Sequence, residues 1–286
     1  MHLMRYKLVF FVLSTLVILP GLFYLVTSGL KLGIDFTGGS LLEYKFDKPI
    51  EKRNLEKYGV VNQSGPNTYI LRTKSIEQNE LNNLKQKIAS SAGTFTAQRE
   101  ENVGPVIGNE LKQKALIALI LASVAIVLYI TWSFRRVPKP ATSWRFGIAA
   151  IVALVHDVLV VVGIFAILGK FLSVEIDTLF VTALLTIIGF SVHDTIVVFD
   201  RIRENLPKHL SKKFSDIADI SITQTLARSL NTSLTVVFVL LALLLFGGET
   251  IKWFVVALLV GIISGTYSSI FNATALLAYW EERLGH

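Results

Sequence analysis

Long, uninterrupted runs of apolar residues separate the polar stretches of this chain. About 20 helical residues cross the ~30 Å hydrocarbon core of a bilayer, so an apolar run of about 18 residues or more predicts a transmembrane helix. The strands of a membrane β-barrel alternate between apolar and polar residues. The runs here do not alternate and therefore predict helices. The six qualifying runs are Leu8–Val26, Ala115–Phe134, Phe146–Leu168, Thr178–Phe199, Leu230–Phe246 and Ile251–Tyr279.

The first run has two interpretations. Arg5 and Lys7 precede it and Thr27-Ser28-Gly29 follows it, as in a cleaved signal peptide. However, the run is long for a signal peptide, and six spans return the C-terminus to the side on which the chain begins. We therefore expect residues 1–30 to hold a retained helix. The fifth run is short unless the residues before Leu230 extend it, and Ser215–Leu226 is typical of an amphipathic helix that leads into it.

Residues 31–113 form the only long hydrophilic stretch, and their pattern predicts a small folded domain. Strand-like and helix-like segments follow one another in the order βαββαβ, which is the ferredoxin-like pattern. The expected fold is an all-α membrane bundle of six transmembrane helices, from residues 1–30 and 114–286, with this small α+β domain. The expected strands are Leu41–Phe46, Gly59–Asn62, Thr68–Arg72 and Thr94–Gln98, and the expected helices are Pro49–Tyr58 and Ile76–Ala89.

The charge distribution predicts the orientation in the membrane. The net charge of +7 could indicate nucleic-acid binding, but the basic residues flank alternate ends of the spans. The opposite short loops carry only Lys170 and Lys252. Basic loops stay in the cytoplasm, so both termini are expected there and residues 31–113 on the far side, with lipid rather than nucleic acid around the chain. The basic residues are Arg5, Lys7, Arg135, Arg136, Lys139, Arg145, Arg201, Arg203, Lys208, Lys212, Lys213 and Arg228.

The sequence contains no internal energy source. No GxxxxGK[ST] phosphate loop occurs, and the loops on the basic side are too short for an ATPase domain. There is no cysteine, so disulfides and thiolate metal sites are excluded. Any work that the protein does must therefore come from a partner or from an ion gradient.

Two ionisable pairs lie inside predicted spans. His156-Asp157 lies near the middle of the third span, and His193-Asp194 lies toward the basic end of the fourth. A charge at bilayer depth costs at least ~2.5–3.5 kcal/mol on insertion scales, so such residues usually face a bundle interior or a water path. The alternatives are a proton or ion relay and an interhelical hydrogen bond from a protonated carboxyl. For Asp194 the relay is favoured; for Asp157 both stay open, and the histidines are expected to be hydrogen-bonding neighbours.

Helical spacing places other polar and small residues on stripes. Gly261 and Gly265 form a GxxxG motif on the sixth span, which is typical of close helix packing. Arg228, Thr232 and Thr235 align at the start of the fifth span, so an Asp194–Arg228 ion pair is expected to hold the carboxylate ionised. The stripe on the fourth span is Thr178, Thr182, Thr186, Gly189 and His193, and the sixth span continues with Ser268, Asn272 and Ala275.

Several motifs resemble the SecD and SecF translocase subunits, and they follow in the family's order from end to end. The small hydrophilic domain favours SecF, because SecD-like chains carry a much larger exported region. The motifs are GIDFTGGS at Gly33–Ser40, VGPVIGNEL at Val103–Leu111, ALVHDV at Ala153–Val158, GFSVHDTIVVFDRIREN at Gly189–Asn205, TLARSLNTSLT at Thr225–Thr235 and FGG at Phe246–Gly248.

The resemblance implies a function and a site. Chains of this type pair with SecD in a twelve-helix complex of the resistance-nodulation-division (RND) type in the inner membrane. That complex assists the SecYEG channel and the SecA motor, and uses the proton gradient, without a cofactor, to complete preprotein export. The family's functional carboxylate falls on Asp194 and its basic partner on Arg228. The resemblance assigns a role to Asp157 less securely, and His193 stands where many members of the family have asparagine. The motifs that would join the domain to the bundle contribute Gly33, Asp35, Gly38, Gly39, Gly104 and Pro105.

Three other functions are weighed against this one. An RND-type exporter of small molecules or lipids shares the fold, but usually has two halves and large porter domains. An intramembrane enzyme would need three or four converging metal ligands or a complete nucleophile motif, and the sequence offers neither. A passive scaffold does not explain the buried charges. The sequence does not distinguish a proton from a sodium ion as the coupling ion.

Overall fold

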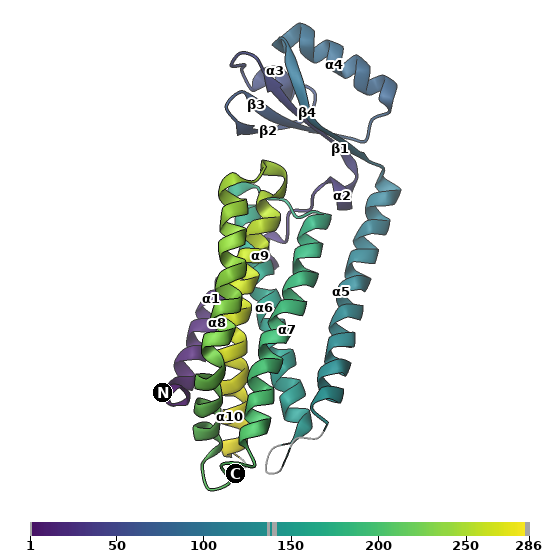
Figure 1. The fold of residues 1–286 in the computed structure, drawn as a ribbon. Helices are drawn as coiled ribbons and strands as arrows, with labels where there is room; N and C mark the ends of the chain where they lie inside the picture. Colours follow the sequence, from purple (N-terminus) through teal and green to yellow (C-terminus); the bar gives the residue numbers. More distant parts are fainter. Residues whose placement is uncertain (1, 136–137, 139–141, 284–286) are drawn as a thin grey trace. The chain divides into compact units, whose positions relative to one another are not determined.

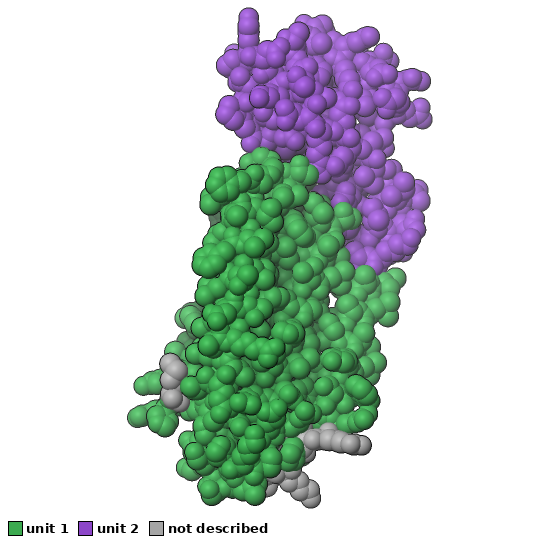
Figure 2. All heavy atoms as spheres, viewed as in Figure 1, with its two compact units in different colours: residues 1–31, 117–286 green, residues 32–116 purple. Residues whose placement is uncertain are grey.

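The computed structural model describes residues 2–135, 138 and 142–283, and the chain divides into two compact units. The helical bundle comprises the residues up to 31 and from 117 onward (Figure 2). The sheet domain comprises residues 32–116. Arg136 and Lys139, two of the predicted basic flanking residues, lie outside the described residues.

All six predicted spans are present as helices long and apolar enough to cross a membrane. The fifth is a single 33-residue helix, so the amphipathic segment before Leu230 is its first part. A short 3-10 turn, η1 (Leu3–Tyr6), precedes the first span. The spans are α1 (Lys7–Ser28), α5 (Pro105–Ser133), α6 (Ser143–Leu172), α7 (Thr178–Asn205), α8 (Phe214–Phe246) and a last span made of α9 (Glu249–Tyr267), the π-helical turn η2 (Ser268–Ala273) and α10 (Thr274–Arg283) (Figure 1).

The interior of the bundle is formed by α6, α7 and the last span. Half of the apolar window of α6 and of α7 is buried within the structure, but only 6% of that of α5. The α5 helix packs through its last turns, where the Phe134 ring lies 5.5 Å from that of Phe146. Large apolar residues on α1, α5 and α8 therefore face outward, as expected for helices that meet lipid or another membrane protein.

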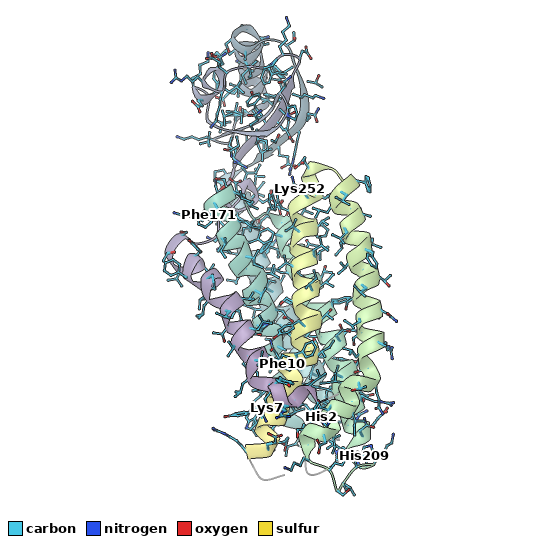
Figure 3. All side chains as sticks on the ribbon, turned by 90° about the vertical axis from the view of Figure 1, so that its left-hand side faces the viewer. His2, Lys7, Phe10, Phe171, His209 and Lys252 are labelled. Carbon is cyan, nitrogen blue, oxygen red and sulfur yellow. The ribbon has the colours of Figure 1, made fainter. Side chains whose placement is uncertain are left out.

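The start of α1 lies at the same end of the bundle as the basic loops. The backbone N–H of Met4 donates to Asp219 Oδ1 near the start of α8, at 2.9 Å. Lys7 forms an ion pair with Glu282 at the end of α10. His2, Lys7 and His209 lie at this end, and Phe171 and Lys252 lie at the other (Figure 3).

The sheet domain has the predicted ferredoxin-like topology. Its four strands pair antiparallel in the order β2-β3-β1-β4, which is what two interleaved βαβ units produce. Leu42, Leu55 and Ile88 are fully buried and join the sheet to the helices on its face. The elements are α2 (Ile34–Thr37), β1 (Gly39–Phe46), α3 (Arg53–Glu56), β2 (Val60–Gly65), β3 (Thr68–Thr73), α4 (Gln78–Ala92) and β4 (Phe95–Val103).

One local prediction for this domain was wrong, and one short element was not predicted. The helix expected over Pro49–Tyr58 is only the single turn α3. Its first residues are held outside a helix, because the Ile50 carbonyl accepts a hydrogen bond from the Tyr69 hydroxyl at 3.0 Å. The turn α2, within the Gly33–Ser40 motif, was not expected at all.

Candidate functional site

Two buried carboxylates form the candidate site. Asp157 on α6 is 0% exposed and Asp194 on α7 is 2% exposed. Burying an ionised carboxylate is costly unless hydrogen bonds or an opposite charge compensate it. The partners of each carboxylate therefore indicate what it can do.

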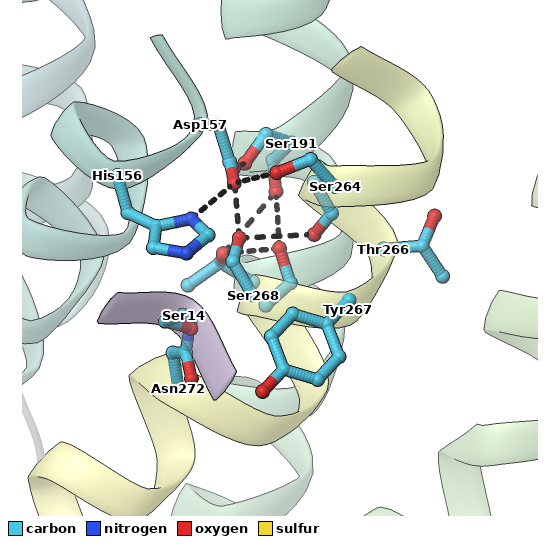
Figure 4. Close-up of polar contacts among 12 residues, drawn as sticks. Ser14, His156, Asp157, Ser191, Ser264, Thr266, Tyr267, Ser268 and Asn272 are labelled. Atoms are coloured by element: carbon cyan, nitrogen blue, oxygen red, sulfur yellow. Dashed lines mark hydrogen bonds and ion pairs between the residues drawn. The ribbon is translucent and has the colours of Figure 1, made fainter. Parts of the chain in front are cut away.

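Asp157 is the more strongly hydrogen-bonded of the two. Its Oδ2 accepts from Ser191 Oγ at 2.5 Å and from Ser268 Oγ at 2.8 Å, and its Oδ1 accepts from Ser264 Oγ at 3.1 Å (Figure 4). His156 Nδ1 lies 3.0 Å from Oδ1. Hydrogen bonds to a charged acceptor are the strong ones, so this carboxylate fastens α6 to α7 and to the last span.

The π-helical turn η2 supplies part of this network. A π turn places one extra residue in the helix and is frequently found at functional sites. Ser268 faces Asp157, while Ser269 Oγ donates to the Ser191 carbonyl at 2.9 Å and accepts from Thr195 Oγ1 at 2.8 Å. Asn272 Nδ2 reaches Ser14 Oγ on α1 at 2.6 Å. One turn thus provides polar contacts to α6, α7 and α1.

Asp194 has only long contacts. Ser233 Oγ on α8 lies 3.5 Å from its Oδ2, and His193 Nδ1 lies 3.8 Å from its Oδ1. Ser233 Oγ also lies 2.6 Å from Thr266 Oγ1, whose own proton goes to the Ile262 carbonyl. The Ser233 hydroxyl has one proton and two acceptors within reach, Asp194 Oδ2 and Thr266 Oγ1. When that proton is directed to Thr266, a lone pair of Ser233 can accept a hydrogen bond from a protonated Asp194.

The two carboxylates lie on different sides of α9. Ser264 and Ser268 reach Asp157, whereas Thr266 points away from it (Figure 4). Thr266 Oγ1 instead contacts Ser233 Oγ on α8. Residues two apart on a helix are about 200° apart around its axis, so one helix can serve both carboxylates separately. Gly265 faces α7 between them, and a Cβ there would lie 3.1 Å from Ser191 Cβ.

The expected Asp194–Arg228 ion pair is not formed in this structure. Arg228 is exposed and makes no ion pair with the described residues. Ser233 contacts Asp194, and Arg228 precedes it by five residues, about 140° away around α8. The stripe of Arg228, Thr232 and Thr235 is thus the outward face of α8. Arg228 also lies 14 residues into α8, about 21 Å from its start, instead of flanking it.

The remaining predicted residues fall into three places. His193 and the threonines Thr182 and Thr186 are exposed, and both threonine hydroxyls donate to carbonyls of their own helix. Gly261 lies against α7, where a Cβ would lie 2.3 Å from Ile187 Cδ1. The GIDFTGGS and VGPVIGNEL motifs both lie in the sheet domain. The predicted junction residues therefore belong to that domain, and they are Gly33, Asp35, Gly38, Gly39, Gly104 and Pro105.

Those two motifs run side by side where the chain enters and leaves the domain. Gly39 pairs with Val103 across β1 and β4. Gly38 has a φ of +71°, and a Cβ there would lie 2.8 Å from Pro105 Cα, so only glycine fits. Close backbone packing thus ties the first residues of the domain to the start of α5.

Sequence reasoning missed most of the hydroxyl partners. Ser191, Ser233, Ser264 and Thr266 were not singled out, because a serine or threonine in an apolar span is usually a packing residue. A usable signal was the four-residue spacing of Ser191 with Thr195 and of Ser264 with Ser268. Among the residues that the structure describes, no group of three or more His, Asp or Glu side chains could hold a metal ion.

Comparisons with known proteins agree with this architecture. The family model described as "Protein export membrane protein SecD/SecF, C-terminal" matches residues 83–283, and the "SecD/SecF GG Motif" model matches residues 23–50. The protein translocase subunit SecF of Thermobaculum terrenum is 48% identical, with 98% of this chain and 94% of that protein covered. The SecF of Anaerolinea thermophila is 42% identical over the same shares.

A solved structure is also similar. The crystal structure of SecDF from Thermus thermophilus, described as a translocon-associated membrane protein, superimposes with a TM-score of 0.86 at 32% identity. The match covers 98% of this chain and 38% of the SecDF chain. Six apolar helices around buried carboxylates, with a small antiparallel sheet domain, define a multi-pass membrane protein of the protein-export class. The chain belongs to the SecF family of protein translocase subunits.

Proposed function

We propose that this chain pairs with a SecD subunit and uses the proton motive force to promote late stages of preprotein export through the SecYEG channel, alongside SecA. One observation carries the proposal: Asp194 is buried among apolar helices with no partner closer than 3.5 Å among the described residues. A carboxyl in that position needs a proton or a mobile counter-charge, which is what a relay requires.

The proposed orientation follows from the charges. The end of the bundle with the basic loops, where α1 begins and α10 ends, is the cytoplasmic end in the inner membrane. The sheet domain, residues 32–116, is then on the exported side, where the preprotein emerges. Moving one charge through 100 mV yields about 2.3 kcal/mol, which is enough to shift a two-state equilibrium by more than tenfold.

The proposed cycle begins when Asp194 takes up a proton. Its O–H then donates to Ser233, and the negative charge beside α8 disappears. Loss of that charge changes the contacts of α7 with α8, while the Asp157 network keeps α7 fastened to α6 and to the last span. The helix movement reaches the sheet domain through the glycine-rich junction that includes Gly38 and Gly39.

The proposed role of Arg228 is to meet the SecD subunit. An arginine on the outward face of a span is costly in lipid unless an acidic group or water reaches it. A helix of SecD that offers a carboxylate to Arg228 would supply this compensation.

The decisive variant is Asp194→Asn, which keeps the shape but cannot exchange a proton. In membrane vesicles that contain the chain with SecD, SecYEG and SecA, we expect the stimulation of export by the proton gradient to be lost, while ATP-driven export persists. Asp200→Asn is the matched control, because Asp200 lies on the same helix in a half-exposed ion pair with Arg203. Normal gradient-dependent export by Asp194→Asn would exclude the relay.

A further inference from the structure

A column of buried hydroxyl groups runs along α8. Ser221, Thr225, Ser229 and Ser233 recur every four residues, and all are buried, with Ser221 at 0% and Ser229 at 2% exposed. Residues four apart lie above one another on a helix, about 6 Å apart along the axis. We call these four residues the hydroxyl column.

One end of the hydroxyl column reaches Asp194. Ser233 Oγ is 3.5 Å from Asp194 Oδ2. Leu240, which continues the same face of α8 beyond this point, is buried and apolar. The column therefore ends at the carboxylate.

The other end reaches an open hollow at the basic-loop end of the bundle. Asn205 Nδ2 donates to Ser221 Oγ at 2.9 Å and to Gln224 Oε1 at 2.8 Å. Gln224, with Asp216 and Asp219, lines a hollow of about 600 Å³. The column thus extends from the buried carboxylate toward a polar surface depression, although the Ser221 and Thr225 hydroxyls donate to carbonyls of their own helix and not to one another.

Close packing alone does not account for the column. Serine and threonine inside a helix usually satisfy their hydroxyl by donating to the carbonyl one turn earlier, as Thr225 Oγ1 does to Ser221 O at 3.0 Å. Ser229 Oγ does not: it is buried with no hydrogen-bond partner among the residues that the structure describes. A buried hydroxyl without a protein partner is the expected place for an ordered water.

The spacing also suits water. Two hydroxyls about 6 Å apart are too far for a direct hydrogen bond, but one water between them can bond to both. A proton moves along such a chain without leaving a charge on any hydroxyl, because each oxygen accepts one proton and passes on another.

We propose that the hydroxyl column is the water-lined route by which protons pass between Asp194 and the basic-loop end of the bundle. The proposal rests on the proton-exchange role of Asp194, and it assigns Ser229 as a positioning residue that holds water at the middle of the route.

The chain contains no cysteine, so single cysteines can report water directly. A membrane-impermeant methanethiosulfonate reagent reacts with the thiolate, which forms only where water reaches the thiol. In inverted membrane vesicles that hold the chain with its SecD subunit, we expect Thr225→Cys and Ser229→Cys to react roughly tenfold or more faster than the controls. Leu230→Cys is the lipid-facing control at the same depth, and Leu240→Cys is the buried control beyond Asp194. Reaction of Ser229→Cys at the rate of Leu230→Cys would overturn the proposal.

A second pair of variants tests transport. Valine and threonine have the same shape, so Ser229→Val and Ser229→Thr strain the packing alike and differ only in the hydroxyl. We expect Ser229→Val to slow gradient-dependent export at least severalfold relative to Ser229→Thr, with equal thermal stability of the two. Equal export by both variants would refute the route, and Asp194→Asn would still test the relay independently. If Asp194→Asn exports normally, the proton role fails, whereas the cysteine reactivities still show whether water enters the column.

Discussion

Asp157 and Asp194 are both aspartates and are similarly buried, but they differ in their hydrogen-bond partners. Three serine hydroxyls donate to Asp157 from α7 and the last span. Asp194 has contacts at 3.5 and 3.8 Å only. Strong donors make a carboxylate a fixed structural anchor, whereas weak ones leave it free to change its protonation state.

Asp157→Asn tests the anchor. The amide replaces one acceptor oxygen by a donor NH₂ that faces hydroxyl donors, so at least one charge-assisted hydrogen bond is lost, at a cost of about 1.5–3 kcal/mol. We expect a lower midpoint of thermal unfolding in mild detergent. The half-exposed Asp200→Asn should change it little, since surface ion pairs contribute about 0–1 kcal/mol. An unchanged midpoint for Asp157→Asn would show that the network does not hold the helices.

Tyr44 in the sheet domain gives a prediction about pH. Burial, and then the negative charge of Glu100, raise the pKa of the Tyr44 phenol above its ordinary value of about 10. The folded state therefore keeps this proton longer than the unfolded state, so its contribution to stability is complete below about pH 10 and is lost as the pH rises further.

Tyr44→Phe should therefore extend the alkaline stability of the domain. At neutral pH we expect little loss, because the buried Tyr44 hydroxyl makes no hydrogen bond of good geometry with the described residues and has only the Glu100 carboxylate nearby. Hydrogen exchange of the sheet domain in the full chain, followed against pH, measures both the stability at neutral pH and the stability at alkaline pH. Tyr58→Phe is the control, since the bond of Tyr58 to the Ser91 hydroxyl lowers its pKa instead. A large loss at pH 7 in Tyr44→Phe would contradict this account.

At this scale the sequence identified the carboxylates but not their partners. A charge inside an apolar run is conspicuous, and Asp157 and Asp194 were found that way. Serine is common in spans for packing, and its hydrogen-bond partner depends on which helix lies opposite. The face of α8 was misjudged for the same reason: Arg228 was placed toward Asp194, whereas Ser233 occupies that position.

Among the elements, the contact of α1 with α6 depends on two glycines. A Cβ at Gly21 would lie 2.6 Å from Gly163 Cα, and one at Gly163 would lie 2.8 Å from Gly21 Cα. Without a hydrophobic driving force between helices in lipid, close backbone approach provides the attraction. The two helices can therefore touch here only because neither residue has a side chain.

Gly163→Ala should separate α1 from α6. We expect a destabilisation of about 1–3 kcal/mol, typical of overpacking, measured as a lower thermal midpoint in detergent. Gly189→Ala on α7 is the matched control, because a Cβ there meets nothing within 4 Å. Equal midpoints for the two variants would mean that the α1–α6 contact adjusts freely.

The elements themselves were largely predictable. Apolar run length predicted the spans, and runs of strand-forming residues next to turn signals predicted the strands of the sheet domain. The turn η2 was not predictable, because no residue type in Ser268–Ala273 favours a π turn by itself. The turn is stabilised by its hydrogen bonds to the neighbouring helices, which the sequence does not show. The single turn α3 depends in the same way on a distant partner, the hydroxyl of Tyr69.

On the scale of the whole molecule, much of the bundle lacks a protein neighbour. The α5 helix is almost wholly exposed, and α7 and α8 present His193 and Arg228 on outward faces within apolar spans. Such surfaces are those of one subunit of a larger membrane assembly.

Arg228→Gln should weaken that assembly without weakening the chain. We expect reduced co-purification of SecD in mild detergent and an unchanged thermal midpoint of the isolated chain, because Arg228 has no ion pair with the described residues. Arg203→Gln, which removes a pair with Asp200 at the end of α7, is the control that should leave co-purification unchanged. Full retention of SecD by Arg228→Gln would assign the association to other surfaces.

The π turn also has a consequence for insertions and deletions. Because η2 holds one residue more than an α-helical turn would, it accommodates that residue without rotating α10. Removing a single residue from η2 would therefore convert it to an α-helical turn and leave the side chains of α10 facing the same neighbours, at the expense of the Ser268 and Ser269 contacts. Removing a residue from the regular helix α9 instead would rotate all that follows by about 100°, and Glu281 would lose Arg145, which it contacts at 2.6 Å, far from the deletion.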